Sequence, residues 1–311
     1  VSTFFRWTPH AKAHSITEGA GKFALTLKES KKAFGRTKRL TLEKIRDEFE
    51  IAKKDCKTIG SAEIVEFATE LSEGRQPQTV GNYMSHLSSI FAIARPAWKI
   101  DLDYSAMEDA QVVMKRLGLV SKSAQRDRRP TLEELDKLME HYSDREIRYQ
   151  AMIPMRRQIA FAIFSTRRQE EISTITWTDY DEDHKRVMVR NMKNPGEKVG
   201  NDVWCDLTPE AIRIIGSMPK SAPEIFPYEA KSVSSSFTKA CALLGIDDLH
   251  FHDLRHEGIS RLFELGWNIP HVATVSGHRS WNSLKRYSHI KQRGDKYEGW
   301  KWLDILAPAQ Q

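Results

Sequence analysis

The stretch LHFHDLRHEGIS, residues 249–260, is the most informative part of this chain, and it is followed by VSGHRS (275–280) and LKRYSHI (284–290). Four polar residues recur in these stretches among apolar helical positions: His252, Arg255, His278 and Tyr287. Side chains three positions apart share a helix face, so His252 and Arg255 form a natural clamp for a planar or tetrahedral oxyanion. A Tyr hydroxyl beside such a clamp is a plausible nucleophile toward phosphorus. The pattern predicts phosphoryl transfer without a metal.

Length and composition set the outer limits of this prediction. The 311 residues favour two domains over one, because a single hydrophobic core stops growing near this size. The net charge of +6 favours an anionic partner. No apolar run approaches the length of a membrane span, and no signal-peptide pattern opens the chain. The three cysteines are far apart and unpatterned, which suits a reducing compartment and argues against a disulfide framework or a zinc knuckle: Cys56, Cys205 and Cys241.

The first third of the chain has a helical pattern, from Leu40 to about Leu117. Apolar residues repeat at helical spacing in three stripes, the last of which is expected to stop at Pro96. We expect these stripes to be core faces. The polar side of the third stripe has the composition of a phosphate-contacting surface or of an ordinary solvent-facing helix: Gln78, Asn82, Ser85, His86 and Ser89.

A charged stretch, SKSAQRDRRP (121–130), indicates an interdomain linker, and its basic residues suit either a solvated linker or an anionic partner. Thr131 and Glu134 then form a capping box that opens a helix. Helical pattern continues to about Thr174.

Two β-rich runs follow, RVMVRNMK (186–193) and DVWCDL (202–207), joined by a hairpin-like loop. Thr208 and Pro209 start another helix in the usual order of cap and proline. The rest, to Tyr287, is predicted to be helical with breaks at the glycines: Gly245, Gly266 and Gly277.

The order HDLRH, then GH, then a Tyr nine residues after that His resembles the tyrosine recombinases, that is, phage-type integrases and shufflon-type DNA invertases. The resemblance is strong over roughly 131–290 and weak in the helical region before it. It implies a mainly α fold with a small antiparallel β-sheet, in a two-domain architecture. The implied divisions are a leader of unknown role (1–24), a helical core-binding domain that contacts DNA (25–120), the linker (121–130), an α/β catalytic domain (131–291) and a C-terminal tail that could dock on a neighbouring protomer (292–311).

The first arginine of the family stands in T-G-x-R-x-x-E-[IL], and this chain has STRRQEEI (165–172), with Thr166 in place of the usual Gly. Two registers fit, one with Arg167 and Glu170, the other with Arg168 and Glu171. The downstream family pattern matches the second register, in which Arg168 binds the phosphate and Glu171 supports it. Arg167 is then expected to be a backbone contact or a surface residue. The alternative for the second pair is a plain helical ion pair.

The resemblance also assigns the remaining catalytic groups. Lys193 ends the first β-run where the family carries its catalytic lysine on a mobile hairpin, and Lys198 on the same loop competes for that role. A lysine near a phosphate can donate a proton to a departing 5′-oxygen. His252 and Arg255 would bind the phosphate, and His252 could also take the tyrosine proton.

Further along, the family places a phosphate-contacting His at His278 and the nucleophile at Tyr287. His256 is expected to pack or to support the site. His252 and His256 have the spacing of a zinc pair, but Asp253 replaces the glutamate of H-E-x-x-H and an Arg intervenes, so no metal is predicted.

The implied enzyme is a site-specific DNA recombinase that forms a 3′-phosphotyrosyl link and completes two strand exchanges through a Holliday junction. The link stores the phosphodiester energy, so no cofactor is predicted. The implied partners are double-stranded DNA sites, three further protomers in a homotetramer and, as a further candidate, an accessory DNA-bending protein. The implied location is the bacterial cytoplasm, at the nucleoid. Two alternatives remain, a type IB topoisomerase-like enzyme and an inactive DNA-binding protein.

Overall fold

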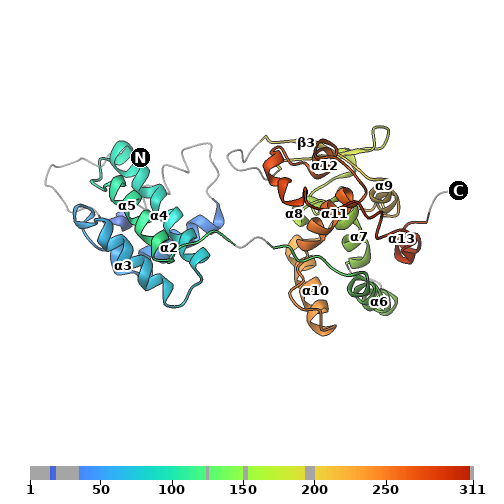
Figure 1. Cartoon of the computed structure of the whole chain (residues 1–311), viewed down its shortest axis with the longest axis horizontal. Helices are drawn as coiled ribbons and strands as arrows, with labels where there is room; N and C mark the ends of the chain where they lie inside the picture. Colours follow the sequence, from blue (N-terminus) through green and yellow to red (C-terminus); the bar gives the residue numbers. More distant parts are fainter. Residues whose placement is uncertain (1–14, 19–34, 124–125, 150–152, 193–199, 309–311) are drawn as a thin grey trace, which may run out of the picture. The chain divides into compact units, whose positions relative to one another are not determined.

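Helices dominate the computed structural model, which describes residues 15–18, 35–123, 126–149, 153–192 and 200–308 (Figure 1). The chain divides into two compact units, 1–125 and 126–311. The division falls inside the stretch that has the composition of a linker. Within the described ranges, no helix combines the length and apolarity that crossing a bilayer requires.

The described residues of the first unit form helices around one apolar core. The longer helices and short 3-10 turns are α2 (Arg36–Glu48), η1 (Glu50–Ala52), η2 (Cys56–Thr58), α3 (Ser61–Ser72), α4 (Pro77–Trp98) and α5 (Tyr104–Arg116). The predicted stripes supply the core, as with Ile64, Leu71 and Leu87, which are completely buried. The predicted stop at Pro96 is wrong, because a proline so near the end of a helix disturbs only its last turn. The helix ends after Trp98, where Lys99 takes a left-handed conformation.

The described residues of the second unit combine eight α-helices and three 3-10 turns with a small sheet (Figure 1). Its α-helices are α6 (Leu132–Arg148), α7 (Met155–Ser165), α8 (Gln169–Ile172), α9 (Pro209–Gly216), α10 (Ala230–Leu243), α11 (Asp253–Glu264), α12 (Ile269–Ser276) and α13 (Lys301–Leu306). Its 3-10 turns are η3 (Trp177–Asp179), η4 (Trp281–Ser283) and η5 (Lys285–Tyr287). Two of the predicted caps are confirmed: Thr131 caps α6 through the capping box, and the Thr208 hydroxyl caps α9.

The sheet is antiparallel with the order β1 (Tyr180–Asp181), β2 (Arg186–Val189) and β3 (Val203–Asp206). The two predicted β-runs form β2 and β3, and β1 is an addition that the pattern did not indicate. Val187 pairs with Cys205 on the neighbouring strand, and both side chains are buried. Residues directly opposite each other in a sheet lie on the same face. The sheet therefore contributes one face to the core of the second unit.

Helix α11 lies so close to α7 that only glycine fits at one point of contact. A Cβ atom on Gly258 would stand 2.0 Å from the carbonyl oxygen of Ile163. This close approach brings the start of α11, which carries Arg255, against the end of α7. The packing of two helices thereby joins residues that are far apart in sequence.

Beyond Gly277 the predicted helix is wrong: the chain makes two 3-10 turns instead, and Tyr287 ends the second. The Tyr287 side chain is buried in a small apolar cluster with residues of α11 and α12, including Phe263 and Val275. Two short turns rather than a rigid helix therefore present the tyrosine.

The C-terminal segment folds onto its own unit. Trp300 and Trp302 are buried in the main core, and both indole N–H groups donate to Asp136, at 2.9 and 3.0 Å. Arg213 also donates to the carbonyl of Ala307, at 2.9 Å. Docking of this tail on a neighbouring protomer concerns an assembly and stays a prediction.

Candidate active site

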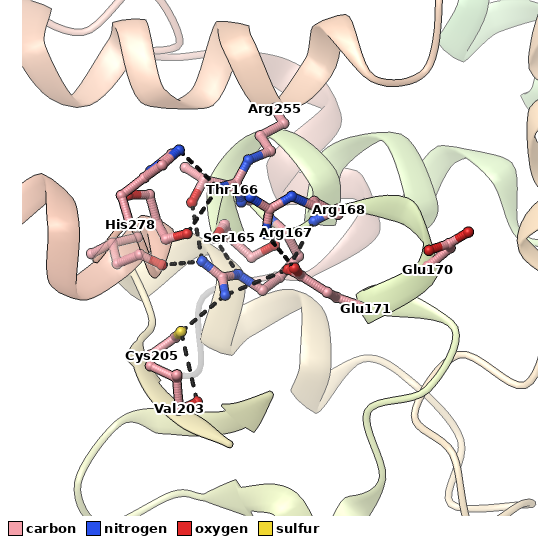
Figure 2. A network of polar contacts seen from close by, with 12 residues as sticks. Ser165, Thr166, Arg167, Arg168, Glu170, Glu171, Val203, Cys205, Arg255 and His278 are labelled. Carbon is pink, nitrogen blue, oxygen red and sulfur yellow. Dashed lines mark hydrogen bonds and ion pairs between the residues drawn. The ribbon is translucent and has the colours of Figure 1, made fainter. Parts of the chain in front are cut away.

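Thr166 stands where helix α7 ends, and its left-handed backbone (φ 57°) turns the chain sharply. The family pattern has glycine here, the residue that adopts this conformation without strain. The turn sends the next two side chains in different directions (Figure 2). The location of this turn explains how adjacent arginines come to have unlike roles.

The Arg167 side chain is 0% exposed, so the expectation of a surface residue is wrong. Its guanidinium donates to the Cys205 sulfur at 2.9 Å and to the carbonyls of Ser165, at 3.2 Å, and Val275. These partners belong to α7, β3 and α12. Arg167 therefore ties together three elements beneath the site.

The Arg168 side chain is 25% exposed and donates to the Glu171 carboxylate at 2.6 Å. The Arg168 backbone N–H also donates to that carboxylate, at 3.1 Å, so Glu171 caps helix α8. Glu170 points away from this network (Figure 2). The structure thus pairs the two residues of the second register directly.

Arg255 is almost completely buried, with 3% exposure. Its guanidinium donates to the Thr166 carbonyl and, at 2.9 Å, to the Ser276 carbonyl, so it joins the ends of α7 and α12. Burial, together with the charges of Arg168 and Arg167, lowers the pKa of Arg255 to about 9. The guanidinium remains protonated at neutral pH, but it is poor in compensating negative charge.

His278 lies directly beside Arg255. Its Nε2 is 3.4 Å from a guanidinium nitrogen of Arg255, and its Nδ1 is 2.8 Å from the Ser276 hydroxyl. Burial lowers the pKa of His278 to about 3, with the charge of Arg255 as the next cause. A neutral ring that accepts from Arg255 at Nε2 carries its hydrogen on Nδ1, which then donates to Ser276.

The Tyr287 hydroxyl shares a hydrogen bond with Nδ1 of His256, a contact that the sequence did not predict. The tyrosine ring also stacks on Phe263, with 6.0 Å between ring centroids and 10° between planes. Burial raises the pKa of Tyr287 above its ordinary value, although the charges of Arg286 and Arg255 oppose the rise. The phenol is therefore protonated at neutral pH.

His252 and His256 occupy one face at the start of α11, and their rings meet edge to face at 5.1 Å. In the ranges that the structure describes, no group of three or more His, Cys, Asp and Glu side chains is arranged to hold a metal ion. Lys193 and its competitor Lys198 lie outside the described residues.

The network has more positive than negative charge. Arg167, Arg168 and Arg255 gather around the carboxylate of Glu171 (Figure 2). Burial raises the pKa of Glu171, but the charges of Arg167 and Arg255 outweigh it and hold that pKa below its ordinary value. The carboxylate is ionised and balances only one of the three cations, so the site is built to receive an anion.

The arginines that suggested a solvated linker are instead paired with carboxylates, Arg126 and Arg129 with those of α11 and Arg128 with Glu134 of α6. Two guanidinium nitrogens of Arg126 donate to the two carboxylate oxygens of Asp253, at 3.1 and 2.9 Å. Arg129 donates to the Glu257 carboxylate at 2.7 Å. The side chains of Asp253 and Glu257 are both 0% exposed. Because Asp253 and Glu257 flank the residues that line the site, residues 126–130 brace the catalytic helix.

The structure brings five of the seven sequence-predicted residues into one region: Arg168, Glu171, Arg255 and His278 in one network, and Tyr287 on the same unit within range of the Arg255 charge. His252 stands beside them through His256. Sequence reasoning missed the contact of His256 with the tyrosine and the burial of Arg167. The position of His256 directly after Arg255 was a signal for its contact with the tyrosine. The apolar residues before Arg167 were a weaker signal for the burial of Arg167.

This combination of fold and site defines a tyrosine-type site-specific DNA recombinase. A model of the phage integrase family matches residues 128–293, and the chain belongs to that family. It is 30% identical over 293 residues to the shufflon-specific DNA recombinase of Escherichia coli, across 91% of this chain and 71% of that protein. It is also 22% identical to the integrase of Salmonella phage P22, across 69% of this chain and 55% of that protein.

Solved structures share the fold at lower identity. The Tn1549 transposon integrase in complex with transposon right-end DNA superposes with a TM-score of 0.68 at 13% identity, covering 94% of this chain and 99% of that one. A lambda integrase tetramer bound to a Holliday junction gives a TM-score of 0.66 at 17% identity, covering 86% of this chain and 78% of that one. The mainly α fold with a small antiparallel sheet is thereby confirmed, as is the family.

Proposed function

We propose that this recombinase cleaves DNA with Tyr287 as nucleophile and with Arg168, Arg255 and His278 as the phosphate-binding groups. The observation that carries the proposal is the uncompensated positive charge around Glu171, which includes Arg255, a cation whose charge also acts on the buried Tyr287 hydroxyl. A DNA phosphate supplies the missing anion. Arginine forks bind nonbridging phosphate oxygens and stabilise the charge that builds on them during attack, the contribution that usually dominates such catalysis.

The step breaks the bond between phosphorus and the 5′-oxygen and forms a 3′-phosphotyrosyl link. Lys193 would protonate the departing 5′-oxygen, and His252 would add a hydrogen bond to the phosphate. Glu171 holds Arg168 in place through the contact at 2.6 Å. Attack by the 5′-hydroxyl of a partner duplex then reseals the strand, so the reaction requires neither ATP nor a metal for its energy balance.

The proposal extends to the assembly. Two rounds of strand exchange through a Holliday junction require four active sites, and the lambda integrase is a relative in fold that was solved as a tetramer on such a junction. The first unit would bind the recombination site with the polar face of α4. Gln78, Asn82 and Ser85 of that face line one pocket together with Lys115 and Lys122 of the same unit, a combination suited to a DNA backbone. The reaction would take place at the nucleoid of a bacterial cell, where DNA and partners meet.

A suicide-substrate assay tests the proposal. Duplexes with a randomised core and a nick lose a short fragment on cleavage, so the covalent complex accumulates and is seen as a shifted band on a denaturing gel. Wild type should form this band, and Tyr287→Phe should bind the same DNA without forming it. An adduct with Tyr287→Phe would refute the nucleophile. Binding without an adduct by wild type would favour an inactive DNA-binding protein.

The topoisomerase-like alternative makes a different product. A recombinase incubated with two copies of its selected site should yield a four-way junction on a native gel. Relaxation of supercoiled DNA without any junction would support the alternative.

A further inference from the structure

The contact between His256 and Tyr287 has a chemical meaning beyond packing. The two side chains come from α11 and η5 and are 31 positions apart in sequence, and the phenolic oxygen shares a hydrogen bond with Nδ1 of the imidazole. When the imidazole hydrogen is on Nε2, the phenol donates and Nδ1 accepts. The rings lie 6.2 Å apart and are tilted by 32°, so the contact is a directed hydrogen bond rather than a stack. Phe263 stacks on the tyrosine ring and restrains its orientation.

We propose that His256 is the general base of DNA cleavage: its Nδ1 takes the phenolic proton as the Tyr287 oxygen attacks phosphorus. The inference rests on the proposed role of Tyr287 as nucleophile. It gives His256, expected only to pack or support, a direct place in the chemistry.

The protonation states of the free site suit this role. Burial raises the pKa of Tyr287, so the phenol enters the reaction with its proton and requires an acceptor. The pKa of His256 is lowered to about 4, with burial as the largest cause. The charges of His252 and Arg286 also lower this pKa, whereas the charge of Asp253 raises it. The imidazole is therefore neutral at pH 7, and the tautomer that carries its hydrogen on Nε2 offers the Nδ1 lone pair to the hydroxyl.

Binding of the DNA phosphate is expected to raise the pKa of His256 and so to make it a stronger base. The charge of Arg255 is among the causes that depress the pKa of His256, and a bound phosphodiester compensates that charge. As the phenolic oxygen bonds to phosphorus, it loses its affinity for the proton. The transfer to His256 is thus unfavourable in the free protein and favourable along the reaction, which keeps the tyrosine inert until DNA is bound.

The step balances in atoms and charge. In cleavage, the Tyr287 oxygen–phosphorus bond forms, the bond from phosphorus to the 5′-oxygen breaks, the phenolic proton moves to His256 and the 5′-oxygen takes a proton from Lys193. In religation, the 5′-hydroxyl attacks and gives its proton to Lys193, while His256 returns a proton to the leaving phenolate. Each group ends the cycle in its starting state.

A conservative substitution separates proton transfer from positioning. In His256→Asn the amide oxygen occupies nearly the position of Nδ1 and still accepts the tyrosine hydrogen bond, but it cannot hold the proton. We expect single-turnover cleavage at saturating DNA to fall by about 100-fold or more, the usual contribution of a general base, with DNA affinity unchanged. His256→Ala should fall at least as far. Circular dichroism and the fraction of chain that binds DNA confirm that the rates come from folded protein.

Two outcomes would overturn the inference. Wild-type cleavage by His256→Asn would mean that the hydrogen bond alone matters, and faster cleavage by His256→Ala would mean that His256 restrains the tyrosine. A failure of the nucleophile assignment looks different, because Tyr287→Phe would then keep its adduct whatever the His256 variants do.

A substrate with sulfur at the bridging 5′ position adds an independent test. Sulfur departs as a thiolate without a proton, so the substrate relieves the loss of a general acid but not that of a general base. We expect it to restore cleavage to Lys193→Ala and not to His256→Asn. Restoration of His256→Asn would assign His256 to the leaving group and reject its role as base.

Discussion

Arg167 and Arg168 are neighbours in sequence and opposites in environment: the side chain of Arg167 is 0% exposed and that of Arg168 is 25% exposed, yet both face the carboxylate of Glu171. Their distances to it are 3.6 and 2.6 Å. The left-handed turn at Thr166 produces this difference. One arginine consequently serves the fold, and the other is available to a substrate.

Replacement of each arginine by alanine should separate these roles. Arg168→Ala should fold normally and lose cleavage by about 100-fold or more, because it removes a donor aimed at the phosphate. Arg167→Ala should lower the free energy of unfolding by about 3–5 kcal/mol, because it leaves a buried network without its cation. Urea unfolding and the suicide-substrate assay measure the two effects. A stable Arg167→Ala that cannot cleave, beside an active Arg168→Ala, would reverse the register.

The contact of α7 with α11 should not tolerate a methyl group at Gly258. Because the new Cβ would lie 2.0 Å from the Ile163 carbonyl oxygen, Gly258→Ala must force the helices apart and move Arg255. We expect a loss of about 3 kcal/mol or more in the free energy of unfolding, together with a loss of cleavage. Gly216→Ala is the matched control, since nothing lies within 4 Å of its Cβ, and should change stability by less than about 1 kcal/mol. Equal melting temperatures for the two variants would contradict the packing described.

The brace on α11 depends on a buried carboxylate. Glu257 is 0% exposed and contacts Arg129 at 2.7 Å, Lys296 at 2.8 Å and the Tyr297 hydroxyl at 3.1 Å. Glu257→Gln leaves the partly buried Arg129 and Lys296 without their buried counter-charge, and we expect it to lower the free energy of unfolding by about 3 kcal/mol. Asp127→Asn, which breaks an ion pair whose carboxylate is 85% exposed, should cost less than about 1 kcal/mol. Chemical denaturation of both variants decides the point, and a Glu257→Gln protein as stable as Asp127→Asn would argue against the brace.

The stability of the DNA-free protein should fall as pH drops below 6.5. Burial lowers the pKa of His256 to about 4 and that of His278 to about 3, whereas both titrate near 6.5 when unfolded. Below 6.5 the unfolded chain takes up protons that the folded chain refuses, so stability is full above that pH and declines toward pH 4. The combined loss should be on the order of a few kcal/mol.

Urea unfolding at several pH values between 7 and 4.5 measures this decline. The double variant His256→Asn, His278→Asn should have a flatter profile than wild type, because its amides do not titrate. Carboxylates with lowered pKa values, such as Asp253 and Asp295, remain in both proteins and lose their contribution at lower pH. Parallel profiles for the two proteins would show that the histidines are not buried in neutral form.

Much of the fold was accessible from local pattern. Thr131 and Thr208 were recognisable as caps because a cap is made within one helical turn. The β-runs around Val187 and Cys205 were recognisable by alternation. The segment after Gly277 was not, because the place of its short turns depends on packing of Tyr287 against α11 and α12 as well as on their local hydrogen bonds.

The sequence by itself determined which residues are proposed as catalytic in this recombinase and the order in which they occur, since His252, Arg255, His278 and Tyr287 are selected by type and spacing. Only the tertiary structure decided which groups meet: that Arg167 is buried, that Arg126 and Arg129 pair with α11, and that His256 meets the tyrosine hydroxyl. The physical reason is the distance along the chain over which each kind of contact forms. Spacing along a helix fixes which side chains share a face, whereas the partner on that face comes from a distant segment whose approach depends on the packing of the whole unit.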